Sequence, residues 1–216
     1  MSAPHPITTL LFDLDGTLVD SYAPICESLN TARAAFGLPP HDLSAVRAMV
    51  GHGLESLIAS NVGSARTDAG VVLFRERYRS VFRQGTHALP GAAATLRTLA
   101  GLRFRMGIVS NKPAYFTREI LVNLGFGTLF GAVWGPERVT RPKPDPEMLL
   151  CALEELGSQP GEALAVGDMP IDISAARAAG MRVCAVPTGS ASADELRAAG
   201  PDYFIEGLES LLSLLR

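Results

Sequence analysis

Four aspartates are the residues of this sequence whose spacing is best suited to chemistry. Asp13 and Asp15 directly follow a short apolar run, residues 7–12, and Asp168 and Asp172 follow another such run at i, i+4 spacing. If both runs are strands of one parallel sheet, the four carboxylates converge beyond its edge and repel one another unless a cation or a proton intervenes. Oxygen ligands without Cys or His favour a hard ion, and Mg²⁺ is the usual one with phosphate substrates. An isolated Asp-x-Asp-Gly could equally be a turn with solvated acids, so the second pair is what favours a site.

A candidate anion site follows a third apolar run, residues 103–109. Ser110, Asn111 and Lys112 precede Pro113, a residue typical of the first turn of a helix. Hydroxyl and amide groups, free backbone N–H donors and the positive end of a helix dipole together bind anions. The plain alternative is a helix cap formed by Ser110 or Asn111.

Lysine is scarce in this chain, which makes its positions informative. Of 19 lysine and arginine residues, two are lysines, Lys112 and Lys143. Lys143 lies among alternating prolines in residues 141–146, which hold a stiff, extended loop and aim its side chain reproducibly. A compact ammonium differs from a planar guanidinium in what it can fit, which favours a functional Lys143 over a solvated surface lysine.

The elements that must position these groups are short strands alternating with helices. Apolar runs predict strands at residues 7–12, 103–109, 132–134, 163–166, 182–186 and 203–205. Helical patterns run from Pro113 to Gly125 and from Pro146 to Gly157, with proline at the start and glycine past the end. The alternation predicts an α/β fold with a Rossmann-like, mostly parallel sheet, in which ligands lie beyond the carboxyl ends of the strands.

A helical cap is predicted after the first strand. About 70 residues separate Asp20 from the next strand–helix pattern near Pro90, where a crossover needs only a dozen or more. Apolar residues recur at helical spacing in residues 25–36, 54–58 and 71–82. We therefore expect a core of residues 1–20 and 85–216 and a cap of residues 21–84. Its loop Gly51-His52-Gly53 is a candidate for substrate contact, because glycines permit close approach, although His52 could simply be a surface residue.

Composition narrows the classes of partner. The 216 residues are 47% hydrophobic and 19% charged with a formal net charge of −3, which is typical of a folded protein and argues against nucleic-acid or membrane binding. Three widely spaced cysteines indicate neither disulfides nor zinc. Residues 1–6 lack the features of a signal peptide. These observations predict a soluble cytoplasmic protein, and they say nothing of its oligomeric state.

Four segments resemble, in order, the motifs of the haloacid dehalogenase superfamily over nearly the whole chain. They are Asp13-Leu14-Asp15-Gly16-Thr17, Ser110-Asn111-Lys112-Pro113, Arg141-Pro142-Lys143-Pro144-Asp145-Pro146 and Gly167-Asp168-Met169-Pro170-Ile171-Asp172. The continuation Leu18-Val19-Asp20-Ser21 and the position of the insertion are most similar to the phosphoglycolate phosphatase branch, with a cap of the first type.

The resemblance implies a role for each motif residue. Asp13 would be the nucleophile that becomes aspartyl-phosphate, and Asp15 the general acid and base. Ser110, Asn111 and Lys143 would hold the phosphoryl group. The expected Mg²⁺ ligands are Asp13, the backbone carbonyl of Asp15, and Asp168. Thr17 and Asp172 would support them, Asp172 by assisting the metal site or by orienting Lys143.

The expected activity is Mg²⁺-dependent hydrolysis of a small phosphorylated metabolite, 2-phosphoglycolate first. A sugar-phosphate mutase, a pyrophosphatase or a nucleotidase of the same family would need the same core residues. From another class, a non-catalytic receiver-like signalling module also places acids, a hydroxyl and lysine beyond a parallel sheet. Met169 departs from the serine that many family members have there, which removes a polar group beside the metal site.

Overall fold

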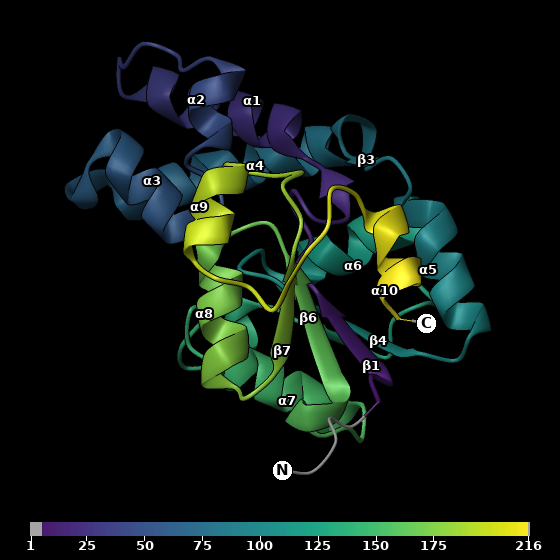
Figure 1. Cartoon of the computed structure of the whole chain (residues 1–216). Helices are drawn as coiled ribbons and strands as arrows, with labels where there is room; N and C mark the ends of the chain where they lie inside the picture. The colour runs from purple at the N-terminus through teal and green to yellow at the C-terminus, as the bar shows by residue number, and fades with distance from the viewer. Residues whose placement is uncertain (1–5, 216) are drawn as a thin grey trace.

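The computed structural model describes residues 6–215, and its centre is a six-stranded parallel sheet (Figure 1). The strand order is β5-β4-β1-β6-β7-β8. The strands are β1 Thr9–Phe12, β4 Arg105–Val109, β5 Ala132–Trp134, β6 Ala163–Gly167, β7 Arg182–Ala185 and β8 Tyr203–Phe204. The predicted α/β class is confirmed. Residues 1–5, on which part of the localisation prediction rests, lie outside the described residues.

Two strands begin two residues later than the apolar runs suggest. In β1, Thr9 is the first residue paired with both neighbours, Arg105 of β4 and Ala163 of β6, so the neighbouring strands set where the sheet begins. Arg103 has a φ of 64°. This left-handed conformation turns the chain just before β4 and excludes Arg103 from an extended strand.

The sheet is covered by helices on both faces, which is why its strands are continuously apolar. Leu10 and Phe12 face one core, shared with α5 (Ala92–Gly101), α6 (Ala114–Asn123) and α10 (Leu211–Leu214). Leu11 points to the other core, shared with α7 (Glu147–Glu155), α8 (Pro170–Ala178) and α9 (Ala193–Ala198). Within residues 6–215, no helix is long and apolar enough to span a bilayer.

A helical segment connects two short antiparallel strands, β2 (Val19–Asp20) and β3 (His87–Ala88). It contains α1 (Tyr22–Ala35), α2 (Leu43–Arg47), α3 (Leu54–Val62) and α4 (Thr67–Gly85), and it lies over one end of the sheet in Figure 1. The apolar spacing predicted α1, α3 and α4, whereas α2 has five residues, too few for a helical period to register. We call residues 21–84 the helical insertion; its status as a separate cap domain stays a prediction.

Aromatic rings join the helical insertion to the core. Phe74, Tyr78 and Phe82 follow one another at i, i+4 on α4, with successive ring centroids 5.5 and 5.4 Å apart. Phe116 of α6 meets Tyr78 edge-on at 4.9 Å. All four side chains are buried, so this column fixes α4 against the core by apolar packing.

Polar contacts tie the other side of the insertion to a core loop. Arg47 of α2 donates to the carbonyl of Gly189 at 3.0 Å and to that of Thr188 at 2.8 Å. Its guanidinium carbon lies 4.7 Å from the centre of the Tyr22 ring. The Tyr22 hydroxyl is in turn 3.1 Å from the hydroxyl of Ser190. Helices α1 and α2 are thereby anchored to residues 188–190.

Candidate active site

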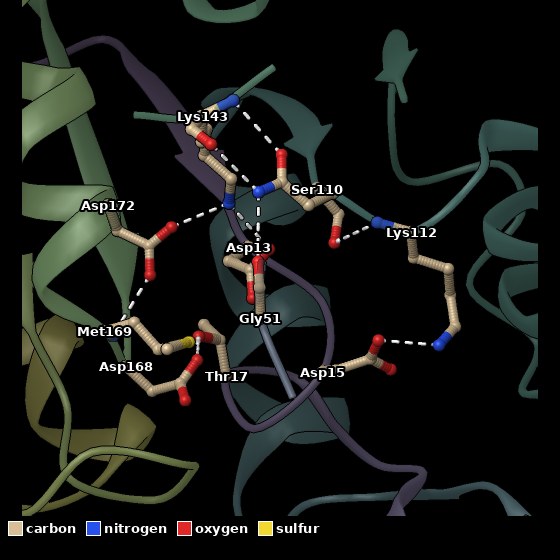
Figure 2. Close-up of polar contacts among 11 residues, drawn as sticks. Asp13, Asp15, Thr17, Gly51, Ser110, Lys112, Lys143, Asp168, Met169 and Asp172 are labelled. Atoms are coloured by element: carbon tan, nitrogen blue, oxygen red, sulfur yellow. Dashed lines mark hydrogen bonds and ion pairs between the residues drawn. The ribbon is translucent and has the colours of Figure 1, made fainter. Parts of the chain in front are cut away.

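The polar motif residues meet at the carboxyl edge of the sheet. Asp13 follows β1 directly, Ser110 follows β4 and Asp168 follows β6, and β1 pairs with β4 on one side and β6 on the other. Parallel pairing brings these three strand ends together because their carboxyl termini share one edge. Lys143 comes from the loop between β5 and α7. Its side chain points toward Asp13 (Figure 2).

The ammonium of Lys143 lies between two carboxylates. Its Nζ donates to Oδ1 of Asp13 at 2.8 Å and to Oδ1 of Asp172 at 2.6 Å, and its side chain is 4% exposed (Figure 2). Burial alone would lower the pKa of Lys143, but the two carboxylates outweigh burial and raise it. Lys143 is therefore a fixed positive charge beside Asp13.

Asn111 holds the Lys143 loop in place. Its side-chain Oδ1 accepts from the backbone N–H of Lys143 at 3.1 Å, and its Nδ2 donates to the carbonyls of Lys143 at 3.1 Å and Gly51 at 2.9 Å. The side chain thus links the core to the helical insertion. Because its hydrogen-bonding groups are engaged there, its backbone N–H is the group left for the predicted phosphate contact. Ser110 is 3% exposed and lines the cavity described below, and its phosphate-binding role stays a prediction.

Asp168 is completely buried, and each of its carboxylate oxygens accepts a hydrogen bond. Thr17 donates its hydroxyl to Oδ1 at 2.9 Å, and the backbone N–H of Ser190 donates to Oδ2 at 2.8 Å. A Cβ at Gly189 would lie 1.7 Å from Oδ2, so only glycine permits this approach. The support from residues 189 and 190 was not predicted, since a Gly-Ser pair in a loop carries no signal of its partner.

Burial and mutual repulsion perturb the acids. Burial, with the charges of Asp13 and Asp172, raises the pKa of Asp168 well above its usual value. Burial also raises the pKa of Asp172 to about 6, even though Lys143 opposes the shift. Asp172 additionally accepts from the backbone N–H of Met169 at 3.0 Å, so both of its oxygens have partners. This arrangement fits the predicted orientation of Lys143 by Asp172.

The site fits a hard divalent cation. Carboxylate oxygens of Asp13, Asp168 and Asp172 lie within 4.8 Å of one another. Four aspartates face two lysines here, which leaves two negative charges uncompensated when all are ionised. The donors at this position are oxygens, the ligand type that Mg²⁺ prefers.

Asp15 has an ion partner that the sequence pattern did not assign. Its Oδ2 accepts from Nζ of Lys112 at 2.6 Å, with both side chains under 10% exposed, and its Oδ1 accepts from the hydroxyl of Ser21. Lys112 also lies over the Tyr78 ring, 5.1 Å from its centre. Burial opposes the charge of Lys112, but Asp15 raises its pKa overall. The scarcity of lysine was the signal that pointed to this residue.

A cavity that is partly open to solvent lies above these groups. The core contributes Asp13, Asp15, Ser110, Lys112 and Lys143. The helical insertion contributes apolar and aromatic side chains, namely Ile25, Val50, Leu54, Leu57, Phe74 and Tyr78. We call the charged and polar side chains of the core the polar floor and the side chains of the insertion the apolar roof. This arrangement suits a small ligand with its charge at one end.

The loop Gly51-His52-Gly53 reaches the cavity through its glycines. Gly51 and Gly53 line it, whereas His52 is not among the lining residues. A Cβ at Gly51 would lie 2.0 Å from Sδ of Met169, so the loop packs directly on the residue that departs from the family pattern. Met169 thus supplies an apolar contact surface for the insertion at this departure from the family pattern.

Comparison with known proteins agrees with this geometry. The family model described as haloacid dehalogenase-like hydrolase matches residues 10–186. The chain belongs to this family of hydrolases, as its motifs predicted. Magnesium is typical of the family.

Individual relatives cover nearly the whole chain. Phosphoglycolate phosphatase 1 of Pseudomonas aeruginosa is 33% identical over 98% of this chain and 83% of its own length. An N-acetylmuramic acid 6-phosphate phosphatase of the same organism is 31% identical over 97% of this chain and 95% of its own. The crystal structure of a haloacid dehalogenase-like hydrolase from Bacteroides fragilis superposes with a TM-score of 0.90 at 29% identity, covering 95% of this chain and 99% of that one.

Proposed function

We propose that the protein is a Mg²⁺-dependent phosphatase that hydrolyses 2-phosphoglycolate through an aspartyl-phosphate on Asp13. The observation that carries the proposal is the Lys143 ammonium, 2.8 Å from Asp13 and 2.6 Å from Asp172, beside three clustered carboxylates. A carboxylate that attacks a phosphate dianion needs positive charge at the reaction centre. This lysine supplies part of it.

Asp13 and Asp15 divide the chemistry. A carboxylate oxygen of Asp13 attacks phosphorus as the bond to the ester oxygen breaks, and Asp15 donates a proton to the departing alkoxide. Asp15 then takes a proton from the water that hydrolyses the aspartyl-phosphate. Ser110 and backbone N–H groups before α6 would hold the phosphoryl oxygens during both steps.

The proposed ligands of Mg²⁺ are Asp13, the backbone carbonyl of Asp15, and Asp168, as the resemblance implied. When bound, the ion would neutralise the negative charge that Lys143 and Lys112 leave uncompensated. Thr17 and the Ser190 N–H would hold the Asp168 carboxylate in position. We also propose that residues 21–84 form a separate cap domain over the core of residues 1–20 and 85–216. A cytoplasmic location is likewise part of the proposal, and Cys26, Cys151 and Cys184 are unpaired.

The names of the relatives are compatible with more than one substrate for this protein. Two proteins from one organism resemble this chain almost equally, and their names specify different substrates. A mutase, a pyrophosphatase and a nucleotidase also remain compatible with the core residues. Membership of a hydrolase family does not support the receiver-like signalling module. The apolar roof of the cavity favours a small leaving group over a sugar, whose hydroxyls would find few partners there.

A substrate panel tests the proposal. We expect Mg²⁺-dependent hydrolysis with the highest kcat/KM for 2-phosphoglycolate, ahead of N-acetylmuramic acid 6-phosphate, hexose phosphates, nucleotides and pyrophosphate. Chelator should abolish activity and Mg²⁺ should restore it. Asp13→Asn is the control for contaminating phosphatase, because asparagine keeps the shape of the side chain and removes its charge. Full activity in metal-free buffer, or a higher kcat/KM for another panel member, would overturn the corresponding part of the proposal.

A further inference from the structure

The cavity contains two lysines on different sides of the β1 exit. Among its described lining residues, Lys112 and Lys143 are the cations. Lys143 is committed to Asp13 and Asp172, the side where phosphate would react. Lys112 instead pairs with Asp15, the proposed proton donor to the leaving group (Figure 2). The second positive charge therefore lies on the leaving-group side.

The surroundings of Lys112 limit what else could pair with it. Its side chain is 8% exposed, its Nζ lies 5.1 Å from the centre of the Tyr78 ring, and Asp15 is its ion-pair partner among residues 6–215. The side chains that the insertion adds to the cavity carry no charge. An anionic group on a bound leaving group would have Lys112 as its nearest available cation.

We infer that Lys112 is a specificity-determining residue that binds a carboxylate attached next to the ester carbon of the substrate. The inference rests on the proposed phosphatase function. To protonate the leaving oxygen, Asp15 must come within hydrogen-bonding distance of it, about 2.6–3.2 Å. Nζ of Lys112 lies 2.6 Å from Oδ2 of Asp15. A carboxylate two bonds from the ester oxygen then falls within reach of the Lys112 ammonium.

This geometry selects a chemical class. Phosphate esters of α-hydroxy acids place their carboxylate at that distance, and 2-phosphoglycolate is the smallest of them. In N-acetylmuramic acid 6-phosphate the carboxylate is on the lactyl ether at carbon 3, far from the phosphate on carbon 6. Lys112 would therefore favour 2-phosphoglycolate and add little to the binding of N-acetylmuramic acid 6-phosphate.

A matched pair of substrates isolates the contact. 2-Phosphoglycolate and its amide, 2-phosphoglycolamide, have similar shape and differ in the charge of one end. A hydrogen bond to a charged group predicts that the wild-type kcat/KM favours the carboxylate by about tenfold to a hundredfold. Lys112→Met should bring the two kcat/KM values close together, while Lys112→Arg, which keeps the charge, should retain part of the preference.

The competing role is that Lys112 only positions Asp15. In that case Lys112→Met would slow both substrates by the same factor and preserve the preference, which would overturn the inference. If turnover of Lys112→Met is too slow to measure, calorimetric binding of both compounds to Asp13→Asn and to Asp13→Asn/Lys112→Met decides, because binding does not require reaction. Equal loss of affinity for carboxylate and amide overturns the inference there. A wild-type enzyme inactive on every phosphate ester would refute the proposed function itself.

Discussion

Asp13 and Asp15 are two residues apart, but their surroundings differ. Asp13 shares Lys143 with Asp172 and belongs to the carboxylate cluster, whereas Asp15 pairs with Lys112 and accepts from Ser21. A nucleophile must stay charged and close to phosphorus, while an acid and base must reach the leaving oxygen and exchange a proton. The two aspartates have separate partners, so each can be tested by its own substitution.

Replacing each aspartate by asparagine should separate the two roles. Asp13→Asn should form no phosphoenzyme from any substrate. Asp15→Asn should be far slower in forming phosphoenzyme from 2-phosphoglycolate than from p-nitrophenyl phosphate, because nitrophenolate leaves without a proton and an alkoxide does not. With the aryl ester it should give a burst of nitrophenol followed by slow turnover. Rapid-quench measurement checks this; equal impairment with both substrates would remove Asp15 from the general-acid role.

Lys143→Arg should lose most activity, about a hundredfold or more in kcat, although the charge is kept. The ammonium lies within 2.8 Å of two carboxylates in a nearly closed position, and a planar guanidinium cannot take its place without displacing one of them. Arg141→Lys is the matched control, since that side chain is 72% exposed on the same loop. Steady-state kinetics with circular dichroism of both variants tests this, and an unimpaired Lys143→Arg would contradict it.

At the scale of elements, the strands and helices that could be predicted are those with a regular apolar periodicity. The alternation of strands and helices and the order of the motifs together predicted that Asp13, Ser110 and Asp168 would meet, because parallel strands share one carboxyl edge. The pairing of Lys112 with Asp15 and the hydrogen bond from Ser190 to Asp168 depend on loop conformations, which leave no period in the sequence. Helix α2 was missed because its five residues are too few to show a helical period, and the role of Arg47 was missed because its partners are loop carbonyls.

Contact between an insertion loop and the core should be needed for efficient turnover. Gly51→Ala places a Cβ against the Met169 thioether and strains a backbone φ of 129°. We expect the loop to shift and the hydrogen bond that its carbonyl accepts from Asn111 to weaken. We expect lower kcat/KM for 2-phosphoglycolate. Gly63→Ala is the matched control, with a φ of 91° and open space around the added carbon. It should cost about 1–3 kcal/mol of stability and leave kcat/KM unchanged. Equal kinetics for the two variants would contradict this.

At the scale of the whole molecule, the acids of the site make stability depend on pH and metal. Because burial raises the pKa of Asp168 and Asp172, the native state binds more protons than the unfolded state between their ordinary and raised values. The free energy of unfolding of the metal-free protein should therefore fall as pH rises from the ordinary value of 3.8 through the pKa of Asp172 at about 6.

Thermal unfolding with and without Mg²⁺ measures this effect. At neutral pH, Mg²⁺ at a hundred times its Kd should add about 2.7 kcal/mol, or roughly 5–10 °C in Tm for a chain of this size. Asp168→Asn should weaken the pH dependence of the Tm of the metal-free protein and remove the response to Mg²⁺. A metal-free Tm that climbs from pH 4 to pH 7 in the wild type but not in Asp168→Asn would contradict the assigned sign.

The loop of residues 188–190 contacts two partners at once. Arg47 holds its carbonyls from the insertion, and its Ser190 N–H holds Asp168. The contact from Arg47 and the binding of the ion to Asp168 should both order this loop. Each should therefore favour the other, because coupling between two sites is reciprocal. Arg47→Met should weaken Mg²⁺ affinity in calorimetry although Arg47 offers the ion no ligand. Conversely, Mg²⁺ should slow hydrogen exchange in α2, and an ion affinity unaffected by Arg47→Met would show that the two events are independent.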